Sequence, residues 1–360
     1  TRQGLCGREH PRKNPWTQVR RMPPSRAMAA MNDVPRELLH AAYRRSHLYL
    51  LKIPALYGLW ALCGWIIWST MDSAWGIPIG VACSLLICNF VRGLGAIGHD
   101  AVHGLVFRNK LAGYLVGLLC WFPTGMSYTI YSIYHLHHHR ITNTYADVDN
   151  FVVTDYTQNP RLARLLTLLV YVVGYPVYFM FQMFRYVPRL GWPRRIRMYA
   201  ELALWFGAMF ACVELLPLRF SFFVYGLPFI FGAFLASVTE MIEHYEKEPS
   251  DDAYNSRTYG TGNILYSFLW SNVSYHNEHH KYPGIPWYNL RTFHHRAYPY
   301  YDAHIQGECC HPGFFDIAAR LYGRIWSLDL ARLQARYAGL DPEREREERM
   351  KIAGAAAAEA

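Results

Sequence analysis

The segment Ser274–Leu290 reads SYHNEHHKYPGIPWYNL and carries three histidines in an HxxHH spacing, followed at once by a Pro/Gly-rich turn. These histidines are His276, His279 and His280. Positions i, i+3 and i+4 of a helix lie on one face, so we expect the three imidazoles to point in one direction. Such a face is a candidate for metal binding, because imidazole is a common ligand of transition metals.

Two earlier clusters repeat this pattern. GHDAVHG carries His99 and His103, and HLHHHR carries His135, His138 and His139. Imidazole suits zinc, copper, iron and nickel, so the ligand type alone does not select the metal. A tetrahedral zinc takes four ligands, or three and a water, and eight histidines exceed that number. The three clusters together therefore predict a site with two metal ions.

The composition indicates a membrane protein. The chain of 360 residues is 52% hydrophobic and only 18% charged, whereas soluble domains are about one quarter charged. Its mean hydropathy of -0.03 indicates few membrane spans and large polar parts. The net charge is +9, and we expect the excess basic residues to mark the cytoplasmic face of a membrane protein. No nucleic-acid partner is expected. Five of the eight cysteines lie within apolar stretches and no CxxC pair occurs, so we expect reduced thiols.

Four apolar runs are long enough to cross a bilayer and are separated by short turns. They form two hairpins around the turns Met71–Ser73 and Pro217–Arg219. We predict an all-α integral membrane protein with four transmembrane helices in two hairpins and a cytoplasmic helical cap that holds the two-metal site. The predicted spans are Leu48–Thr70, Ala74–Val91, Tyr199–Leu216 and Phe222–Ile242.

Two further apolar runs are not expected to cross. Leu111–Met126 is short and interrupted by glycines and prolines, which fits a re-entrant or interfacial segment. Leu162–Phe184 is long enough, but Gly174–Pro176 interrupts it and arginines flank both ends, so we expect a broken hairpin or a surface helix pair. If either run crossed the membrane alone, the histidine clusters would face opposite sides.

Charge orients this topology. The segment before Leu48 carries ten basic residues, whereas the two predicted outer turns carry only Arg219. Basic loops prefer the cytoplasm, so we expect both termini and all histidine clusters there, in a plasma (inner) membrane or the endoplasmic reticulum. No cleavable signal peptide is expected, because the first apolar run follows a long basic segment.

The order HDAVH, HLHHH and HNEHH, with PGIPWYNL after the last, resembles the membrane fatty acid desaturase family of histidine-box di-iron oxygenases. The resemblance runs from about Leu48 to Leu290. It implies two non-haem iron ions that activate dioxygen with external electrons and attack an unactivated C–H bond of a fatty acyl chain. The expected organisation is a disordered basic segment (1–30, with Met28 or Met31 as a plausible start), a desaturase-like membrane domain (31–325) and a charged tail (326–360).

The resemblance also implies the ligands. Family members commonly carry one more histidine just after the last span, and His244 matches that place. Four residues earlier, where one branch of the family has an asparagine that contacts metal through water, this chain has Glu240. His137 is expected to point away, and His294 and His295 lie outside the motif. The implied metal ligands are His99, His103, His135, His138, His139, His244, His276, His279 and His280.

Metal-bound imidazoles need their other ring nitrogen held, usually by a carboxylate or a carbonyl. Each nearby acidic residue could equally be a solvated charge. The candidates for this supporting role are Asp100, Asp147, Asp149, Glu240, Glu243 and Glu278, with Asn272 as a weaker one.

Desaturation of a fatty acyl chain is the expected reaction. A hydroxylase, a carotenoid ketolase or hydroxylase, and an oxidative fatty acid decarboxylase remain alternatives within the family. The chain has no flavin or haem motif, so electrons should come from a ferredoxin or a small cytochrome with its reductase; a basic face suits an acidic donor. A zinc-dependent membrane hydrolase would need only about three histidines. A metal transporter is disfavoured, because the first two spans carry no charge beyond Lys52.

Overall fold

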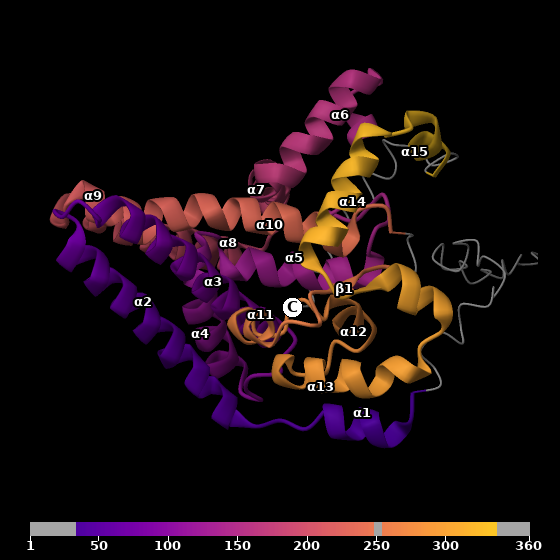
Figure 1. The fold of residues 1–360 in the computed structure, drawn as a ribbon, viewed down its shortest axis with the longest axis horizontal. Coiled ribbons are helices and arrows are strands. Elements are labelled where there is room, and N and C mark those ends of the chain that lie inside the picture. The colour runs from indigo at the N-terminus through magenta and orange to yellow at the C-terminus, as the bar shows by residue number, and fades with distance from the viewer. Residues whose placement is uncertain (1–33, 248–253, 337–360) are drawn as a thin grey trace, which may run out of the picture.

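The computed structural model describes residues 34–247 and 254–336, and within them the chain is almost entirely helical (Figure 1). The expectations for residues 1–30 and for the tail beyond residue 336 lie outside the described residues. Strands β1 (Thr258–Tyr259) and β2 (Cys310–His311) form one short parallel pair. The helices are α1 (Arg36–Ala42), α2 (Lys52–Thr70), α3 (Gly76–Val102), α4 (Lys110–Trp121), α5 (Tyr128–Ile141), α6 (Pro160–Leu169), α7 (Tyr175–Tyr186), α8 (Trp192–Leu215), α9 (Leu218–Ser221), α10 (Leu227–His244), α11 (Ile264–Leu269), α12 (His276–Lys281), α13 (Trp287–Ala297), α14 (Phe314–Trp326) and α15 (Leu330–Arg336).

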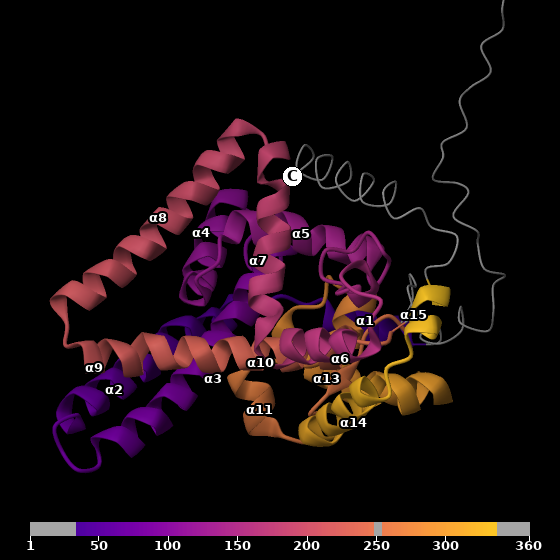
Figure 2. The same ribbon diagram turned by 90° about the horizontal axis from the view of Figure 1, so that it is seen from above.

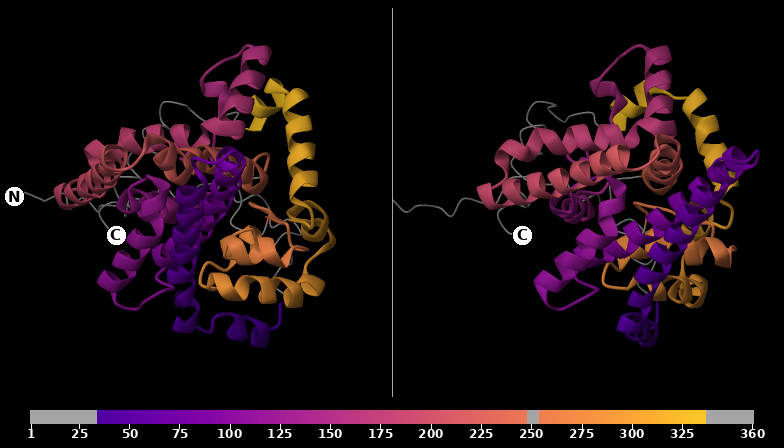
Figure 3. Two further views of the ribbon diagram at one scale, coloured as in Figure 1. Left: turned by 60° about the vertical axis from the view of Figure 1, so that its left-hand side comes forward. Right: turned by 90° about the vertical axis from the view of Figure 1, so that its left-hand side faces the viewer.

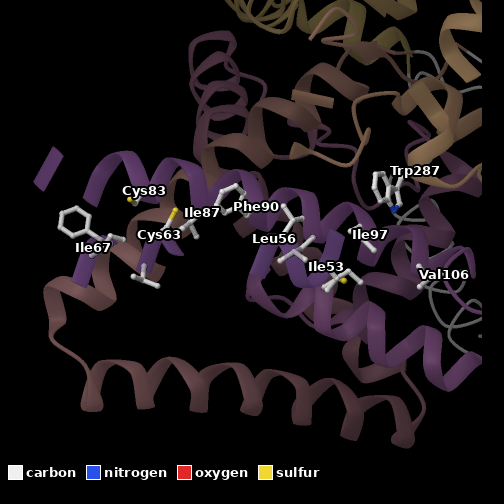
Figure 4. Packing of buried hydrophobic residues seen from close by; sticks show 14 residues of the cluster. Ile53, Leu56, Cys63, Ile67, Cys83, Ile87, Phe90, Ile97, Val106 and Trp287 are labelled. Carbon is white, nitrogen blue, oxygen red and sulfur yellow. The ribbon is translucent and has the colours of Figure 1, made fainter. Parts of the chain in front are cut away.

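Helices α2 and α3 form the first predicted hairpin. Apolar side chains of α2 and α3 meet along one seam, which Figure 4 shows from Ile67 and Cys83 at one end to Ile53 and Ile97 at the other. The turn Phe222–Gly226 also packs closely on α3, because Gly80 of α3 has no side chain: a Cβ there would lie 2.8 Å from the ring of Phe223. Inside a bilayer such close packing replaces the hydrophobic effect as the force between helices.

Helices α8, α9 and α10 form the second predicted hairpin. The π-helical turn Phe222–Gly226 joins α9 to α10 directly before Pro228, whose missing N–H breaks the regular hydrogen-bond ladder. In Figure 2, α8 diverges from α10 along its length. In α8 only Met198 and Glu201 are buried, so most of this helix faces its surroundings.

The turns of both hairpins lie at the same end of the molecule, at the left in Figure 1, while α5, α12 and α13 lie toward the other end. Within the described residues, five helical runs are long and apolar enough to cross a membrane, one more than predicted. They are His47–Thr70, Gly76–Val102, Pro160–Phe184, Trp192–Leu215 and Leu218–His244.

The extra run is the segment predicted as a broken hairpin or surface helix pair. Its break is confirmed: the π-helical turn Val170–Gly174 separates α6 from α7, just before Pro176. A hairpin is wrong, because α6 and α7 continue as one helical run that bends at this turn. In Figure 2, α7 runs across the direction of α10, and the Tyr175 N–H donates to the Ser237 hydroxyl of α10 (3.2 Å).

Helix α4 corresponds to the predicted re-entrant or interfacial segment. With 12 residues it is roughly 18 Å long, too short for a bilayer core of about 30 Å. The Asn109 side chain caps its first turn by accepting from the Ala112 N–H (2.9 Å). It packs beside α3 (Figure 3) and runs back along it, so that the end of α4 lies against Gly95 and Gly98. The chain then turns at Gly125 (φ +76°), and α5 leads to the second histidine cluster.

Candidate metal centre

Four helices bring all nine histidines of the expected ligand set together. α3 continues unbroken to Val102 and so carries the first histidine cluster beyond the apolar run. Helix α5 contributes the second cluster, α12 the third, and His244 is the last residue of α10. Eight of the nine fall into two groups of close nitrogen atoms: His99, His103, His135, His139 and His279 in one, and His138, His244 and His280 in the other.

In the first group the imidazole nitrogens lie as ligands of a single ion would. The Nε2 atom of His135 lies 3.0 Å from the Nε2 atoms of His103 and His139, and His139 Nε2 lies 3.0 Å from His279 Nε2. Metal–imidazole bonds of about 2.1 Å at right angles would place neighbouring nitrogens about 3 Å apart. The group therefore surrounds a position that suits one metal ion.

The ninth histidine joins the second group. His276 Nε2 lies 2.9 Å from His244 Nε2, and its ring packs 4.5 Å from the ring of His280. The ring of His138 is 4.7 Å from that of His244. With His276 included, the second position has four imidazoles against five at the first.

Burial keeps these imidazoles in the form that binds metal. It lowers the pKa of His135, His139 and His279 well below the ordinary value of 6.5, and neighbouring imidazoles lower it further. The same holds for His103, His276 and His280. A neutral imidazole has a free nitrogen lone pair, which is what a metal requires.

Four of the nine clustered rings also have a buried nitrogen without a hydrogen-bond partner among the described residues. The atoms are His99 Nε2, His276 Nδ1, His279 Nδ1 and His280 Nε2. An unpaired buried polar atom costs free energy, and a metal bound at the two Nε2 atoms would remove that cost there. The donor set therefore fits two metal ions.

His138 differs from the other histidines because carboxylates hold its second nitrogen. Its Nδ1 lies 2.9 Å from Asp147 and 3.2 Å from Asp149. Burial lowers the pKa of His138, but these carboxylates outweigh burial and raise it to about 10. The Asp147 carboxylate also accepts from the Asn143 N–H (2.8 Å), so it fixes both the ring and the end of α5.

Glu278 supports the third cluster without contacting a ligand ring. Its buried carboxylate accepts from the hydroxyls of Thr258 and Tyr301 and lies 2.5 Å from His294 Nδ1. This network fixes α12 against β1 and α13. His294, which lies outside the motif, is buried and belongs to this support, and no feature of the HxxHH motif indicated Tyr301.

Asp100 and Asn272 support the site by binding the main chain of Trp287, and only Asp100 also has a weaker contact with an imidazole. Asp100 accepts from the Trp287 N–H (2.7 Å), and the Asn272 amide donates to the Trp287 carbonyl (2.9 Å). The Asp100 carboxylate is 3.6 Å from His99 Nδ1, so its contact with that ring is the weaker one. Together they fix the start of α13, directly after the Pro/Gly-rich turn.

Glu243 and Glu240 lie one turn apart before the end of α10. Glu243 accepts from the Tyr259 hydroxyl (2.5 Å), pairs with Arg92 at 3.5 Å and lies 3.9 Å from His276. Glu240 lines a cavity beside the clusters. The remaining candidates lie apart: His137 is buried but outside both groups, as predicted, and His295 is exposed.

A cavity of about 940 Å³ extends from the clusters between α2, α3, α8 and α10. Its inner end is lined by His138 and His244, and it reaches Leu216 and Phe220 near the α8–α9 turn. Most of its lining is apolar or aromatic. Its lining includes Trp65 of α2, which is 65% exposed, and Met209 of α8.

Comparison with known proteins agrees with this geometry. A sphingolipid delta(4)-desaturase DES1-like protein of Arabidopsis thaliana is 25% identical over 212 residues, covering 57% of this chain and 59% of the relative. The sphingolipid delta(4)-desaturase DES1 of Homo sapiens is 29% identical over 214 residues, covering 57% and 61%. The chain thus spans about three fifths of the length of the curated relatives it matches. The fatty acid desaturase family model matches residues 75–308, which hold all nine clustered histidines, and the chain belongs to that family.

Proposed function

We propose that this protein is a membrane oxidoreductase that uses dioxygen and external electrons at a two-iron centre to desaturate a fatty acyl chain. The observation that carries the proposal is the meeting of nine buried or half-buried imidazoles, in groups of five and four, at the inner end of an apolar cavity. Two metal positions with nitrogen ligands exceed what a one-zinc hydrolase needs. Family membership supports iron as the metal.

The residues of this chain would bind the irons and exclude water from the site. His99, His103, His135, His139 and His279 would bind one ion, and His138, His244, His276 and His280 the other. When bound, two irons supply the activation of dioxygen that lets a saturated methylene lose hydrogen. Asp147 would fix the ring of His138 in this process, and Glu278 and Asp100 would hold α12 and α13 in place.

The cavity would hold the acyl chain with its reacting carbons beside the histidines. Its apolar walls exclude water, which protects a reactive centre from side reactions. Trp65 of α2 lines the cavity and is exposed, so an acyl chain dissolved in the membrane would enter sideways past α2 if this helix crosses the bilayer. Because the relatives are named as sphingolipid desaturases, a saturated sphingolipid belongs among the test substrates beside simple acyl lipids.

We also propose four membrane crossings, with the histidine clusters and both termini in the cytoplasm. The two hairpins point the same way, and α6–α7 lies across them on the inner side (Figures 1 and 2). Exposed arginines surround the clusters, among them Arg44, Arg108 and Arg140. An acidic donor such as a ferredoxin or a small cytochrome would dock on this basic face.

Lipid analysis of an expressing host tests the proposal. Mass spectrometry of lipids from cells with the wild-type chain should show a new double bond, dependent on dioxygen and a reductant. A His279→Ala chain in the same host is the matched control. A new oxygen atom, or a terminal alkene one carbon shorter, would instead assign the chain to another branch of the family and contradict desaturation.

A further inference from the structure

Glu201 stands out as a buried carboxylate inside a candidate membrane span. It lies on α8, where it and Met198 are the buried residues, and the helix is otherwise exposed. A charged side chain at membrane depth is costly and is kept only where other groups pair with it. The partners of Glu201 therefore show what this residue does.

Four donors meet this carboxylate, and they come from two other elements. From α4, the Tyr114 hydroxyl donates at 2.6 Å. From the start of α5, the Ser127 and Thr129 hydroxyls each donate at 2.5 Å, and the Thr129 N–H donates at 3.0 Å. Each carboxylate oxygen thus accepts two hydrogen bonds.

The position of these donors ties Glu201 to the histidines. Ser127 is the N-cap of α5, so the carboxylate lies at the helix end that favours negative charge. The same helix carries His135, His138 and His139 in its last two turns. Asp147 holds the other end of α5, so the helix is fixed at both ends by carboxylates.

We propose that Glu201 is a positioning residue that sets where α5 lies along α8 and thereby places three imidazoles at the two metal positions. The inference rests on the proposed two-metal function. Without Glu201, the polar groups at the start of α5 lose their partner and the helix is free to shift. His135 and His139 would then leave their 3.0 Å spacings to His103, at the end of α3, and to His279 of α12, which suit a single ion.

Anaerobic titration of the purified full-length protein with cobalt(II) tests this role, because cobalt reports ligand geometry in its visible spectrum. Glu201→Leu should weaken cobalt binding by about 10–100-fold, the usual effect of removing a group that positions ligands, and should alter the spectrum. Glu201→Gln, which keeps an accepting oxygen, should stay within a few-fold of wild type. Met198→Ala is the matched control, because it loosens the packing of α8 on α5 without touching the donors.

The outcomes separate this inference from the proposed function. Wild-type protein that binds fewer than two cobalt ions contradicts the two-metal function itself. Wild-type-like binding by Glu201→Leu, or equal weakening by Met198→Ala at the same thermal stability, overturns the positioning role. If Glu201→Leu does not insert, a double Ser127→Ala and Thr129→Val variant removes two of the donors and keeps the carboxylate. The positioning role predicts weaker cobalt binding by this variant, and wild-type-like binding overturns it.

Discussion

At the scale of single residues, burial decides how each histidine behaves. Among the described residues, six of the nine clustered imidazoles have no ion-pair contact with a carboxylate. His99 and His276 have only longer contacts, of 3.6 and 3.9 Å. His138 alone lies within 3.2 Å of two carboxylates. Neutral rings accept a metal directly, whereas His138 must first give up a proton.

His279→Ala removes a ligand of the five-imidazole group. Activity should fall at least about 100-fold, and iron at that position should be lost, because one of the nitrogens that surrounds the ion disappears. His295→Ala is the matched control, since this histidine is exposed and should change activity by less than about twofold. Product formation and iron content measured together check both variants, and equal losses would show that the ligand assignment is wrong.

Asp147→Asn tests the carboxylate beside His138 in metal-free protein. The pKa of His138 is raised from 6.5 to about 10, so the stabilisation by this pair is complete below about pH 6.5 and is lost as the pH rises through about 10. Asp147 has a lowered pKa, so its share is also lost when the pH falls below the ordinary carboxyl range.

The variant should therefore be less stable at pH 7 by about 3 kcal/mol, the usual effect of breaking a buried pair. Its stability should also fall less toward pH 10, although Asp149 still lies 3.2 Å from the His138 ring. Thermal unfolding with a chelator present, from pH 6 to 10, measures this. Asp72→Asn, in the exposed turn after α2, is the control. An unchanged alkaline decline would exclude the Asp147–His138 pair as its source.

The nine clustered histidines could be predicted because spacing and motif are local in sequence. The hydrogen-bond partner of Asp100 and Asn272 could not be predicted in this way. Both bind the main chain of Trp287, which lies far along the chain from Asp100. Glu201 gave no local signal either: its donors are 72 to 87 residues away. Supporting residues are found only when the fold is known.

At the scale of elements, α3 and α11 approach so closely that only glycine fits between them. A Cβ on Gly93 would lie 2.1 Å from the Leu269 carbonyl oxygen, and the Ser271 hydroxyl donates to the Gly93 carbonyl (2.8 Å). α11 leads directly into the third cluster. The contact therefore joins the first and third clusters through the backbone.

Gly93→Ala should destabilise the protein by about 1–3 kcal/mol, because the helices must separate. Gly58→Ala on α2 is the control: nothing lies within 4 Å of its added Cβ, and alanine favours a helix, so stability should stay equal or rise slightly. Thermal unfolding in detergent compares the two. A tolerated Gly93→Ala would mean that α3 and α11 are farther apart in the protein.

Gly232→Trp should shorten the usable cavity. Gly232 lines it and has nothing within 4 Å of an added Cβ, and it lies three turns before His244, roughly 18 Å along α10. Long acyl chains should be converted about tenfold less well, while shorter ones are retained and the iron content is unchanged. Gly207→Trp on α8 has equal room but does not line the cavity, so it should keep the wild-type profile. The same chain-length profile for both variants would exclude this cavity as the acyl site.

Apolar length and periodicity were enough to predict the α2–α3 hairpin, the second hairpin and the short α4. They could not distinguish a bent helix from a hairpin at Gly174–Pro176, because a π-helical turn absorbs the proline without reversing the chain. Tertiary packing decides that case, through the contact of Tyr175 with Ser237.

At the scale of the whole molecule, two hairpins that point the same way leave their histidine-bearing ends together (Figure 1). α4 and α6–α7 return the chain to that end between the hairpins. This arrangement lets clusters separated by more than a hundred residues form a single centre. The central claim is that this centre holds two irons.

Metal analysis of the purified protein, loaded anaerobically with ferrous iron and then desalted, tests that claim most directly. We expect two irons per chain, falling in the His279→Ala variant. One equivalent of zinc as the tightly bound metal, with no retained iron, would contradict the two-iron centre and with it the proposed oxidation of a lipid chain.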